Sequence, residues 1–232
     1  MLTDIFSSFD PATSSLFNNS SILFWMFNFF ILATLQSMFW LAPSRMSSLI
    51  SLPIDMMHSQ ATRTFTLYLK GMTSILVPLF FSLIIVNLSG LIPYMFSTSS
   101  HLLFTLILAL PLWLSLMLSA IFKAPSSFIA ALLPSGAPSW LNPFLTLIES
   151  TSILVRPITL SFRLAANMSA GHIILGLIGI YTASAFFNSL LTSLSLLSIL
   201  TIYVIFEVGI CLIQAYIFCL LITLYADDHP SH

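Results

Sequence analysis

The stretch ILVRPITLSFRLAANMSAGHIILGL, residues 153–177, is apolar enough to be a helix inside a membrane, yet it contains two arginines, an asparagine and a histidine. A charged side chain at the centre of a bilayer costs about 2.5–3.5 kcal/mol on insertion scales. Ionisable residues are therefore rare at that depth, and they mark ion pathways or buried pairs. This stretch predicts a membrane helix whose polar groups have a function.

The composition of the whole chain also predicts a membrane protein. Of its 232 residues, 58% are hydrophobic and 6% are charged, whereas about 25% of the residues of a soluble domain are charged. The mean hydropathy is +1.06, and the formal net charge of −1 gives no general attraction to nucleic acid. We expect an all-α membrane protein of about five membrane helices, forming a single membrane domain over residues 1–232.

Three apolar runs precede the polar stretch, and each is long enough to cross a bilayer as a helix. They cover approximately residues 21–41, 66–94 and 101–122. Residues 44–66 mix charged side chains with methionine and leucine, which favours an amphipathic helix at the membrane interface over an ordinary loop. The domain is then divided into an N-terminal part, a membrane hairpin and a long helical hairpin, at residues 1–67, 68–123 and 139–227.

The end of the chain contains two very long apolar stretches, at approximately residues 142–181 and 184–227. As helices, each would be about 60 Å long, which is twice the hydrocarbon thickness of about 30 Å. Either each stretch is two helices with a hidden break, or each is one helix about 60° from the membrane normal. No Gly-Pro turn interrupts them, although Pro157 can kink the first. We therefore expect a steeply tilted hairpin.

The positions of lysine and arginine orient the chain by the positive-inside rule. Basic residues occur in residues 43–67 and 123–143, whereas the N-terminal tail and residues 95–101 contain none. We expect the N-terminus outside and the C-terminal tail inside. Residues 1–15 carry acids but no basic residue, unlike a secretory or transit peptide, which predicts insertion without a cleaved leader.

The polar residues of the first long stretch fall on two faces of a helix. Glu149, Arg156 and Arg163 are spaced seven residues apart, so they lie near one stripe. Asn167, four residues after Arg163, extends this stripe. His172 lies nine residues after Arg163, a rotation of about 900°, and therefore faces the opposite side.

The second long stretch has a polar face of its own, formed by Glu207 and Gln214, which are also seven residues apart. Antiparallel pairing of the two helices would place Gln214 near Arg163 and Glu207 near His172. The segment RLAANMSAG, residues 163–171, consists mostly of small residues. Such residues either pack two helices together or allow a partner helix to slide past.

The arginine and the titratable residues can do different chemistry. A guanidinium stays charged at any working pH, so it cannot relay a proton, but it can stabilise the charged form of a carboxylate. Glutamate and histidine can bind and release protons. The combination predicts two proton routes kept apart by a fixed charge. The alternatives are a structural ion pair between Glu149 and Arg156 and a snorkelling side chain at Arg163.

Three segments resemble the a subunits of F-type ATP synthase in their mitochondrial form. They are NLSGLIPY at 87–94, ESTSILVRPITLSFRLAANMSAGH at 149–172 and FEVGICLIQAYIF at 206–218. Their order and spacing also match, so the resemblance covers essentially the whole chain. It implies a proton-conducting stator subunit of the Fo sector in the mitochondrial inner membrane. The N-terminus would face the intermembrane space and the C-terminus the matrix.

The resemblance also implies partners and a mechanism. The partners are the c-ring, the peripheral-stalk and other Fo subunits, membrane lipid, and protons as the transported species; it implies no cofactor, no metal and no nucleic acid. Arg163 looks like the family's essential arginine, which faces the carboxylate of each passing c subunit. Asn167 and Gln214 look like its polar companions, and Arg156 has a supporting role.

The titratable residues look like parts of two offset half-channels. His172 and Glu207 resemble the pair in the half-channel open to the intermembrane space, and Glu149 resembles the acid of the matrix-side half-channel. A proton that neutralises a c-subunit carboxylate would allow that site to rotate through lipid, where a charged site would be costly. Arg163 would block direct leakage between the two routes.

Two other classes of function remain as alternatives. A redox subunit that binds haem or quinone would need paired histidines on facing membrane helices. Only His172 is deeply placed, since His58 and His101 look interfacial and the other two histidines lie in the tail. A passive scaffold would use the polar groups only to join helices. Cys211 and Cys219 share one apolar run and look like core residues rather than metal or redox ligands.

Overall fold

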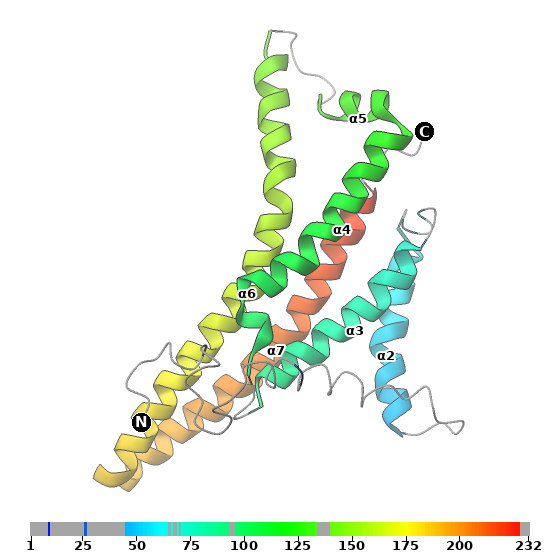
Figure 1. The fold of residues 1–232 in the computed structure, drawn as a ribbon. Coiled ribbons are helices and arrows are strands. Elements are labelled where there is room, and N and C mark those ends of the chain that lie inside the picture. The colour runs from blue at the N-terminus through cyan, green and yellow to red at the C-terminus, as the bar shows by residue number, and fades with distance from the viewer. Residues whose placement is uncertain are drawn as a thin grey trace.

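The computed structural model of the chain describes residues 45–64, 71–92, 96–133 and 140–227, with the single positions 9, 26, 66 and 69. Regular structure in these residues is helical, which confirms the all-α fold. The elements are α2 (Arg45–Ala61), α3 (Met72–Gly90), the short 3-10 helix η5 (Thr98–Ser100), α4 (Leu102–Lys123), α5 (Pro125–Ala131), α6 (Asn142–Asn188) and α7 (Leu190–Asp227) (Figure 1).

Four helices of the described residues are long and apolar enough to cross a membrane: α3, α4, α6 and α7. Of the first predicted span, residues 21–41, the structure describes position 26 alone, so the count of five spans stays a prediction. The predicted interfacial segment does form a helix, α2, which packs against α3. Its interfacial position also stays a prediction.

The two long apolar stretches are each one continuous helix, with no hidden break. α6 has 47 residues and α7 has 38, which correspond to lengths of about 70 Å and 57 Å. α6 ends seven residues later than the sequence predicts, and Ser189, with extended backbone (φ −160°, ψ 135°), reverses the chain. A single extended residue is enough to end one helix and start the next, so no Gly-Pro turn is required.

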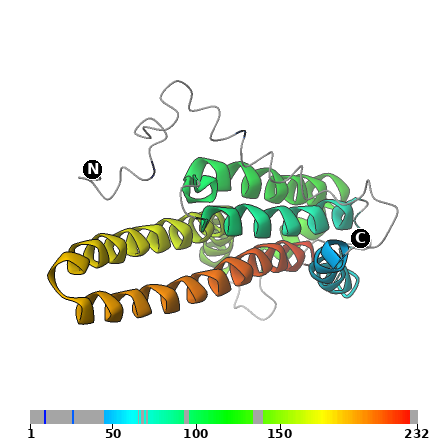
Figure 2. The same cartoon turned by 90° about the horizontal axis from the view of Figure 1, so that it is seen from below.

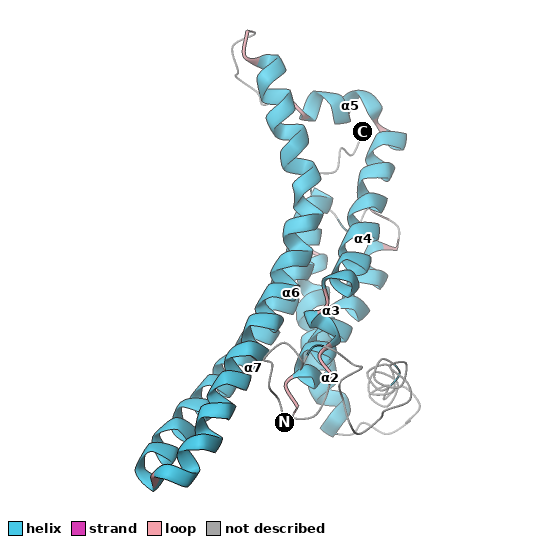
Figure 3. Cartoon of the chain, turned by 60° about the vertical axis from the view of Figure 1, so that its left-hand side comes forward, coloured by secondary structure: helices cyan, strands magenta, loops and turns pink. Residues whose placement is uncertain are grey.

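The α6–α7 hairpin is the longest feature of the molecule, and its closed end projects beyond the other helices (Figures 1 and 3). α6 contains Pro157, which removes one backbone hydrogen bond and favours a bend. Figure 1 shows that α6 changes direction along its length. The other half of the hairpin contacts the remaining helices, because α3 packs against α7 and α4 packs against α6. Figure 2 shows α3 and α4 together on one side of the hairpin.

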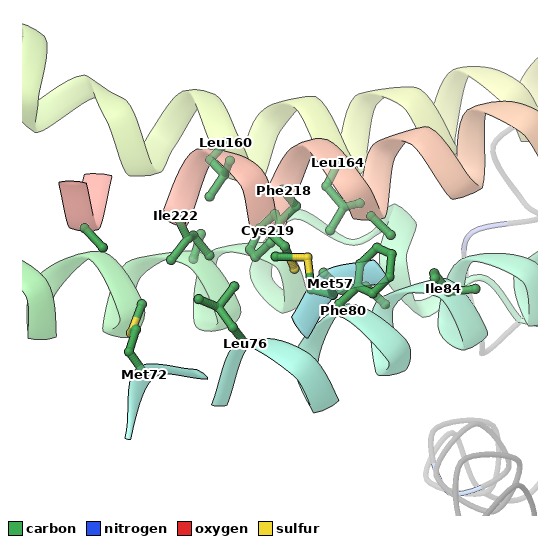
Figure 4. Close-up of a cluster of buried hydrophobic side chains, with 14 of the residues drawn as sticks. Met57, Met72, Leu76, Phe80, Ile84, Leu160, Leu164, Phe218, Cys219 and Ile222 are labelled. Carbon is green, nitrogen blue, oxygen red and sulfur yellow. The ribbon is translucent and has the colours of Figure 1, made fainter. Parts of the chain in front are cut away.

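A buried apolar cluster holds these helices together (Figure 4). It includes Met57 of α2, Leu76 and Phe80 of α3, Leu116 of α4, Leu160 and Leu164 of α6, and Phe218 and Ile222 of α7. In lipid, helices associate through close packing and hydrogen bonds rather than through the hydrophobic effect. The cluster therefore fixes which faces of α6 and α7 turn inward, and thereby the positions of their polar side chains.

Candidate functional site

The antiparallel packing of α6 on α7 brings two pairs of polar positions together. Nδ2 of Asn167 donates a hydrogen bond to Oε1 of Gln214 at 2.8 Å. One turn further along α6, Gly171 lies against Glu207, since a Cβ added at Gly171 would be 2.5 Å from Cδ of Glu207. These two contacts fix the register of the hairpin at the level of its polar residues.

This register is close to the one that the sequence spacing predicts. Gln214 bonds to the residue one turn past Arg163 rather than to the turn of Arg163 itself. Glu207 lies against the residue that precedes His172. The remaining difference of about one turn depends on how the side chains between the helices interlock, which spacing along one helix does not specify.

Glu207 is enclosed by protein, with 2% of its surface exposed. Tyr203, one turn earlier on α7, lies close to its carboxyl group. The close approach requires the absence of a side chain at Gly171, because an added Cβ would also lie 2.9 Å from Oε2 of Glu207. The site therefore holds a proton-binding carboxyl group in a defined place, away from bulk water.

His172 follows Gly171 on α6 and therefore adjoins the site of Glu207. It is half-buried, and its ring stands edge-on to Phe9 with 6.3 Å between the ring centroids. Its Nε2 atom is buried and has no hydrogen-bonding partner among the described residues. A titratable imidazole and a titratable carboxyl group thus lie on neighbouring positions of the hairpin.

Arg163 occupies a different face of α6. Its side chain is exposed, as are those of Ala166 and Ala170, whereas Leu164 and Met168 are buried in the packing against the other helices. Within the described part of the chain, Arg163 makes no ion pair. The guanidinium therefore points away from the core of the chain, beside a surface of small side chains.

Glu149 and Arg156 form an ion pair near the other end of α6. Nη2 of Arg156 lies 3.8 Å from Oε1 of Glu149, and their side chains are 28% and 38% exposed. The guanidinium also lies over the ring of Tyr225 of α7, 5.0 Å from its centroid. Such a cation–π contact contributes about 0.5–1 kcal/mol at an exposed site. Arg156 thus links Glu149 to the last turn of α7.

Asn87 of α3 is a buried polar residue to which the sequence analysis assigned no role. It is fully buried, and neither Oδ1 nor Nδ2 has a hydrogen-bonding partner among the described residues. A buried unsatisfied polar group costs about 1–3 kcal/mol, so a native chain that keeps one has a reason. An amide within an apolar span was the signal present in the sequence.

The cysteines lie in the core, as predicted. Cys211 and Cys219 are free thiols with no exposed surface. Sγ of Cys211 lies 3.6 Å from Sδ of Met168 on α6. Over the residues that the structure describes, no three His, Cys, Asp or Glu side chains are grouped so that they could hold a metal ion.

The sequence matches the family model described as ATP synthase A chain over residues 17–227. The chain belongs to this family. It is 39% identical over 231 residues to ATP synthase subunit a of Locusta migratoria, covering 98% of this chain and 99% of the relative. The subunit a of Drosophila melanogaster is 38% identical over 229 residues, with the same coverage. That of Artemia franciscana is 38% identical over 233 residues, covering 98% of this chain and all of the relative.

Membership in the ATP synthase subunit a family decides between the classes of function that the sequence left open. The chain is a membrane subunit of ATP synthase and not an enzyme by itself. A redox subunit that binds haem or quinone is therefore not supported.

Proposed function

We propose that this chain is the proton-conducting stator subunit of the Fo sector in the mitochondrial inner membrane, where it couples proton flow to the rotation of a c-ring and to ATP synthesis. The family match and the insect relatives support the complex and the organelle, and four apolar helices support a multi-pass subunit. The N-terminus faces the intermembrane space and the C-terminus the matrix, as the distribution of basic residues predicts.

The observation that carries this proposal is the position of Arg163. Its guanidinium is exposed on an apolar helix and has no ion-pair partner in the described residues. At membrane depth an uncompensated charge is costly, so this surface of α6 requires an anionic partner from another subunit. A carboxylate on a passing c subunit fulfils that requirement, and Ala166 and Ala170 leave room for its helix.

The hydrogen bond between Asn167 and Gln214 lies one turn past Arg163 along α6 and supports its position. Because it crosses from α6 to α7 next to the turn of Arg163, it holds the two helices in register where the partner helix passes. An interhelical hydrogen bond in a membrane contributes about 0.6 kcal/mol on average. The bond therefore positions the arginine more than it stabilises the fold.

Glu207 and His172 form the outer half-channel in this proposal. A proton from the intermembrane space reaches their neighbourhood and passes to a c-subunit carboxylate, which becomes neutral and can rotate through lipid at low cost. Glu149, at the far end of α6 and partly exposed, receives the proton from the c subunit on the matrix side. Arg156 keeps Glu149 in place through its ion pair.

Arg163 separates the two routes. It stays charged, so it stabilises the ionised c-subunit carboxylate after the proton has left, and it offers no group through which a proton could pass directly. One charge that moves through 100 mV supplies about 2.3 kcal/mol, so several translocations must be combined for each ATP. In this proposal α6 and α7 lie about 60° from the membrane normal, which their length supports, and helices so tilted can follow the curved side of a ring.

Replacement of Arg163 by alanine in the complete ATP synthase tests the proposal. We expect assembly to remain and proton-driven ATP synthesis to fall by at least about 100-fold, the loss of two orders of magnitude that removal of one electrostatic stabiliser typically causes. Arg63→Ala, which removes an exposed arginine outside the long hairpin, is the matched control and should leave synthesis unchanged. Coupled synthesis at the normal rate in assembled Arg163→Ala complexes would refute the proposal. A scaffold would instead lose assembly and keep coupling in each assembled complex.

A further inference from the structure

We infer that Tyr225 of α7 is a positioning residue for the matrix-side half-channel. Its ring holds the guanidinium of Arg156, and thereby the carboxyl group of Glu149, where a c subunit releases its proton towards the matrix. This inference rests on the proposed function, and it names a residue outside the three segments that carry the family resemblance. It also predicts a defect that is confined to one side of the membrane.

The first observation is the loose geometry of the ion pair that contains Glu149. Nη2 of Arg156 lies 3.8 Å from Oε1 of Glu149, and both side chains are partly exposed. A close charge-assisted hydrogen bond would be about 2.7–2.9 Å long, so this pair attracts the carboxyl group without fixing its place. Arginine also has a long flexible side chain, which loses much rotamer freedom when it is held. The place of Glu149 therefore depends on what orients the guanidinium of Arg156.

The second observation is the aromatic ring that faces this guanidinium. Cζ of Arg156 lies 5.0 Å from the centroid of the Tyr225 ring, which is within the range of about 6 Å for a cation–π contact. A planar guanidinium stacks on an aromatic face, whereas the ammonium group of lysine has no plane to stack. The contact therefore restricts the orientation of the guanidinium as well as its distance from α7.

The ring of Tyr225 is itself held by the protein core. It is half-buried and packs against the buried apolar cluster, which includes its neighbour Ile222 (Figure 4). Ile222 and Ala226 are 2% and 0% exposed, so the last turns of α7 are fixed among the other helices. A tyrosine ring has only two side-chain torsions to order. One ring and one guanidinium thus connect the packed core to Glu149.

Two simpler roles for Tyr225 give different expectations. A tyrosine that anchors a helix end at the membrane interface uses its polar hydroxyl group, so phenylalanine would not replace it. A tyrosine that only fills space in the core uses its apolar volume, so leucine would largely replace it. A positioning role for Arg156 requires the aromatic face, which phenylalanine keeps and leucine lacks.

The test compares the two directions of proton flow through the complete ATP synthase in lipid vesicles. ATP-driven pumping takes protons from the matrix side, through Glu149 in the proposed function, whereas ATP synthesis takes them from the intermembrane-space side. The rate of each is measured against the proton concentration on the side of entry, and pumping is normalised to uncoupled ATP hydrolysis at the same pH. Lys123 and Asp227, the charged residues that end α4 and α7, are the same in all variants.

We expect Tyr225→Leu to raise the matrix-side proton concentration for half-maximal pumping about tenfold, less than the effect of about 100-fold that a full misplacement of 1 Å can cause. The corresponding concentration for synthesis should not rise. Tyr225→Phe should keep both wild-type values. Leu221→Ala is the matched control, because it removes apolar packing one turn earlier on α7 and leaves the ring over Arg156 in place; it should also keep both values.

A second variant tests the same contact from α6. Arg156→Lys keeps the charge and loses the planar group, so it should reproduce the defect of Tyr225→Leu, and the two substitutions together should add no further defect. A wild-type value in Arg156→Lys would overturn the inference, even where Tyr225→Leu does not assemble. An equal defect in Tyr225→Phe and Tyr225→Leu would assign the role to the hydroxyl group instead. Equal rises on both sides of the membrane would assign it to general packing.

Glu149→Gln distinguishes this inference from the proposed function. If Glu149→Gln blocks pumping and Tyr225→Leu leaves it at the wild-type level, only the inference fails. If Glu149→Gln and Arg163→Ala both leave proton-driven synthesis at the wild-type level, the proposed function fails, and the inference fails with it.

Discussion

Replacement of Gly171 by alanine is the sharpest perturbation that the structure offers. An alanine Cβ at this position would lie 2.5 Å from Cδ and 2.9 Å from Oε2 of Glu207, and closer still to Oε1, whereas ordinary contacts begin at 3.4 Å. To reach an ordinary contact, Cδ must therefore move by about 0.9 Å, the difference between 2.5 and 3.4 Å. The flexible end of Glu207 is the part that can move.

The expected effect on stability is small, because two contributions oppose each other. A strained rotamer of the glutamate costs about 0.5–1.5 kcal/mol, and alanine is favoured over glycine in a helix by about 0.8–1.0 kcal/mol. The assembled complex should therefore change in stability by less than about 1 kcal/mol, the difference between these terms. The position of the carboxyl group changes by almost 1 Å, however, and a misplacement of that size can slow a reaction about 100-fold.

The assay is proton-driven ATP synthesis, normalised to the amount of assembled complex. We expect Gly171→Ala to assemble normally and to synthesise ATP about 10- to 100-fold more slowly, by the same sensitivity to position. Gly176→Ala is the matched control, since an added Cβ there meets nothing within 4 Å and the substitution gives the same gain in helix propensity.

Equal rates in the two glycine variants would refute the reasoning, because the clash with Glu207 is the main difference between them. A second substitution tests whether the displaced carboxyl group of Glu207 causes the defect. Glu207→Asp shortens the side chain by one methylene, so it should restore part of the activity of Gly171→Ala. It should impair the protein with the native glycine. Failure of this rescue would assign the defect to a group other than the carboxylate.

Three further outcomes are expected. Alanine at Asn167 and at Gln214 should show a coupling of about 0.6 kcal/mol in a double-mutant cycle on the thermal stability of the complex, because one interhelical hydrogen bond joins them; full additivity would contradict this. Arg156→Lys should keep the charge but lose about 0.5–1 kcal/mol of stability. The same substitution should cause no such loss in a Tyr225→Leu background, because no ring then lies beneath the guanidinium. Burial lowers the pKa of His101 below its usual 6.5. The folded state therefore binds fewer protons than the unfolded state below pH 6.5, and the stability of the region around η5 is complete above that pH and falls as the pH decreases. Hydrogen exchange of η5 at pH 7.5 and 5.5, which bracket the usual histidine pKa of about 6.5, should show this loss in the wild type and not in His101→Gln.

Much of the site could be predicted because helical periodicity acts within one helix. The spacing of seven residues places Glu149 and Arg156 on one stripe, and the structure joins them in an ion pair. Spacing determines the pairing between helices less sharply: it places Gln214 near Arg163, and the bond that the structure shows is to Asn167, one turn further along α6. Spacing gives the direction of a side chain around its own axis, but the offset between two helices depends on how their surfaces interlock.

Two contacts were not predicted at all. They are the close approach of Gly171 to Glu207 and the contact of Arg156 with Tyr225. Glycine at 171 looked like one of several small residues that permit close helix packing. Only the packing of α7 shows that a carboxyl group fills the space that a side chain would occupy. Likewise, nothing near Tyr225 in the sequence indicates that its ring lies beneath a guanidinium 69 positions earlier.

The sequence by itself determined the class of the protein, its long helices and the chemical groups available to it. Composition decides whether a chain can face water, and the period of 3.6 residues decides which side chains share a face. The tertiary structure decided which groups are enclosed, which meet and which stay exposed. Glu207 and Arg163 are both ionisable residues on apolar helices, yet one is buried against Gly171 and the other faces outward. That difference in exposure arises from the packing of α3, α4, α6 and α7 around a shared core. It cannot be derived from the sequence of any one helix.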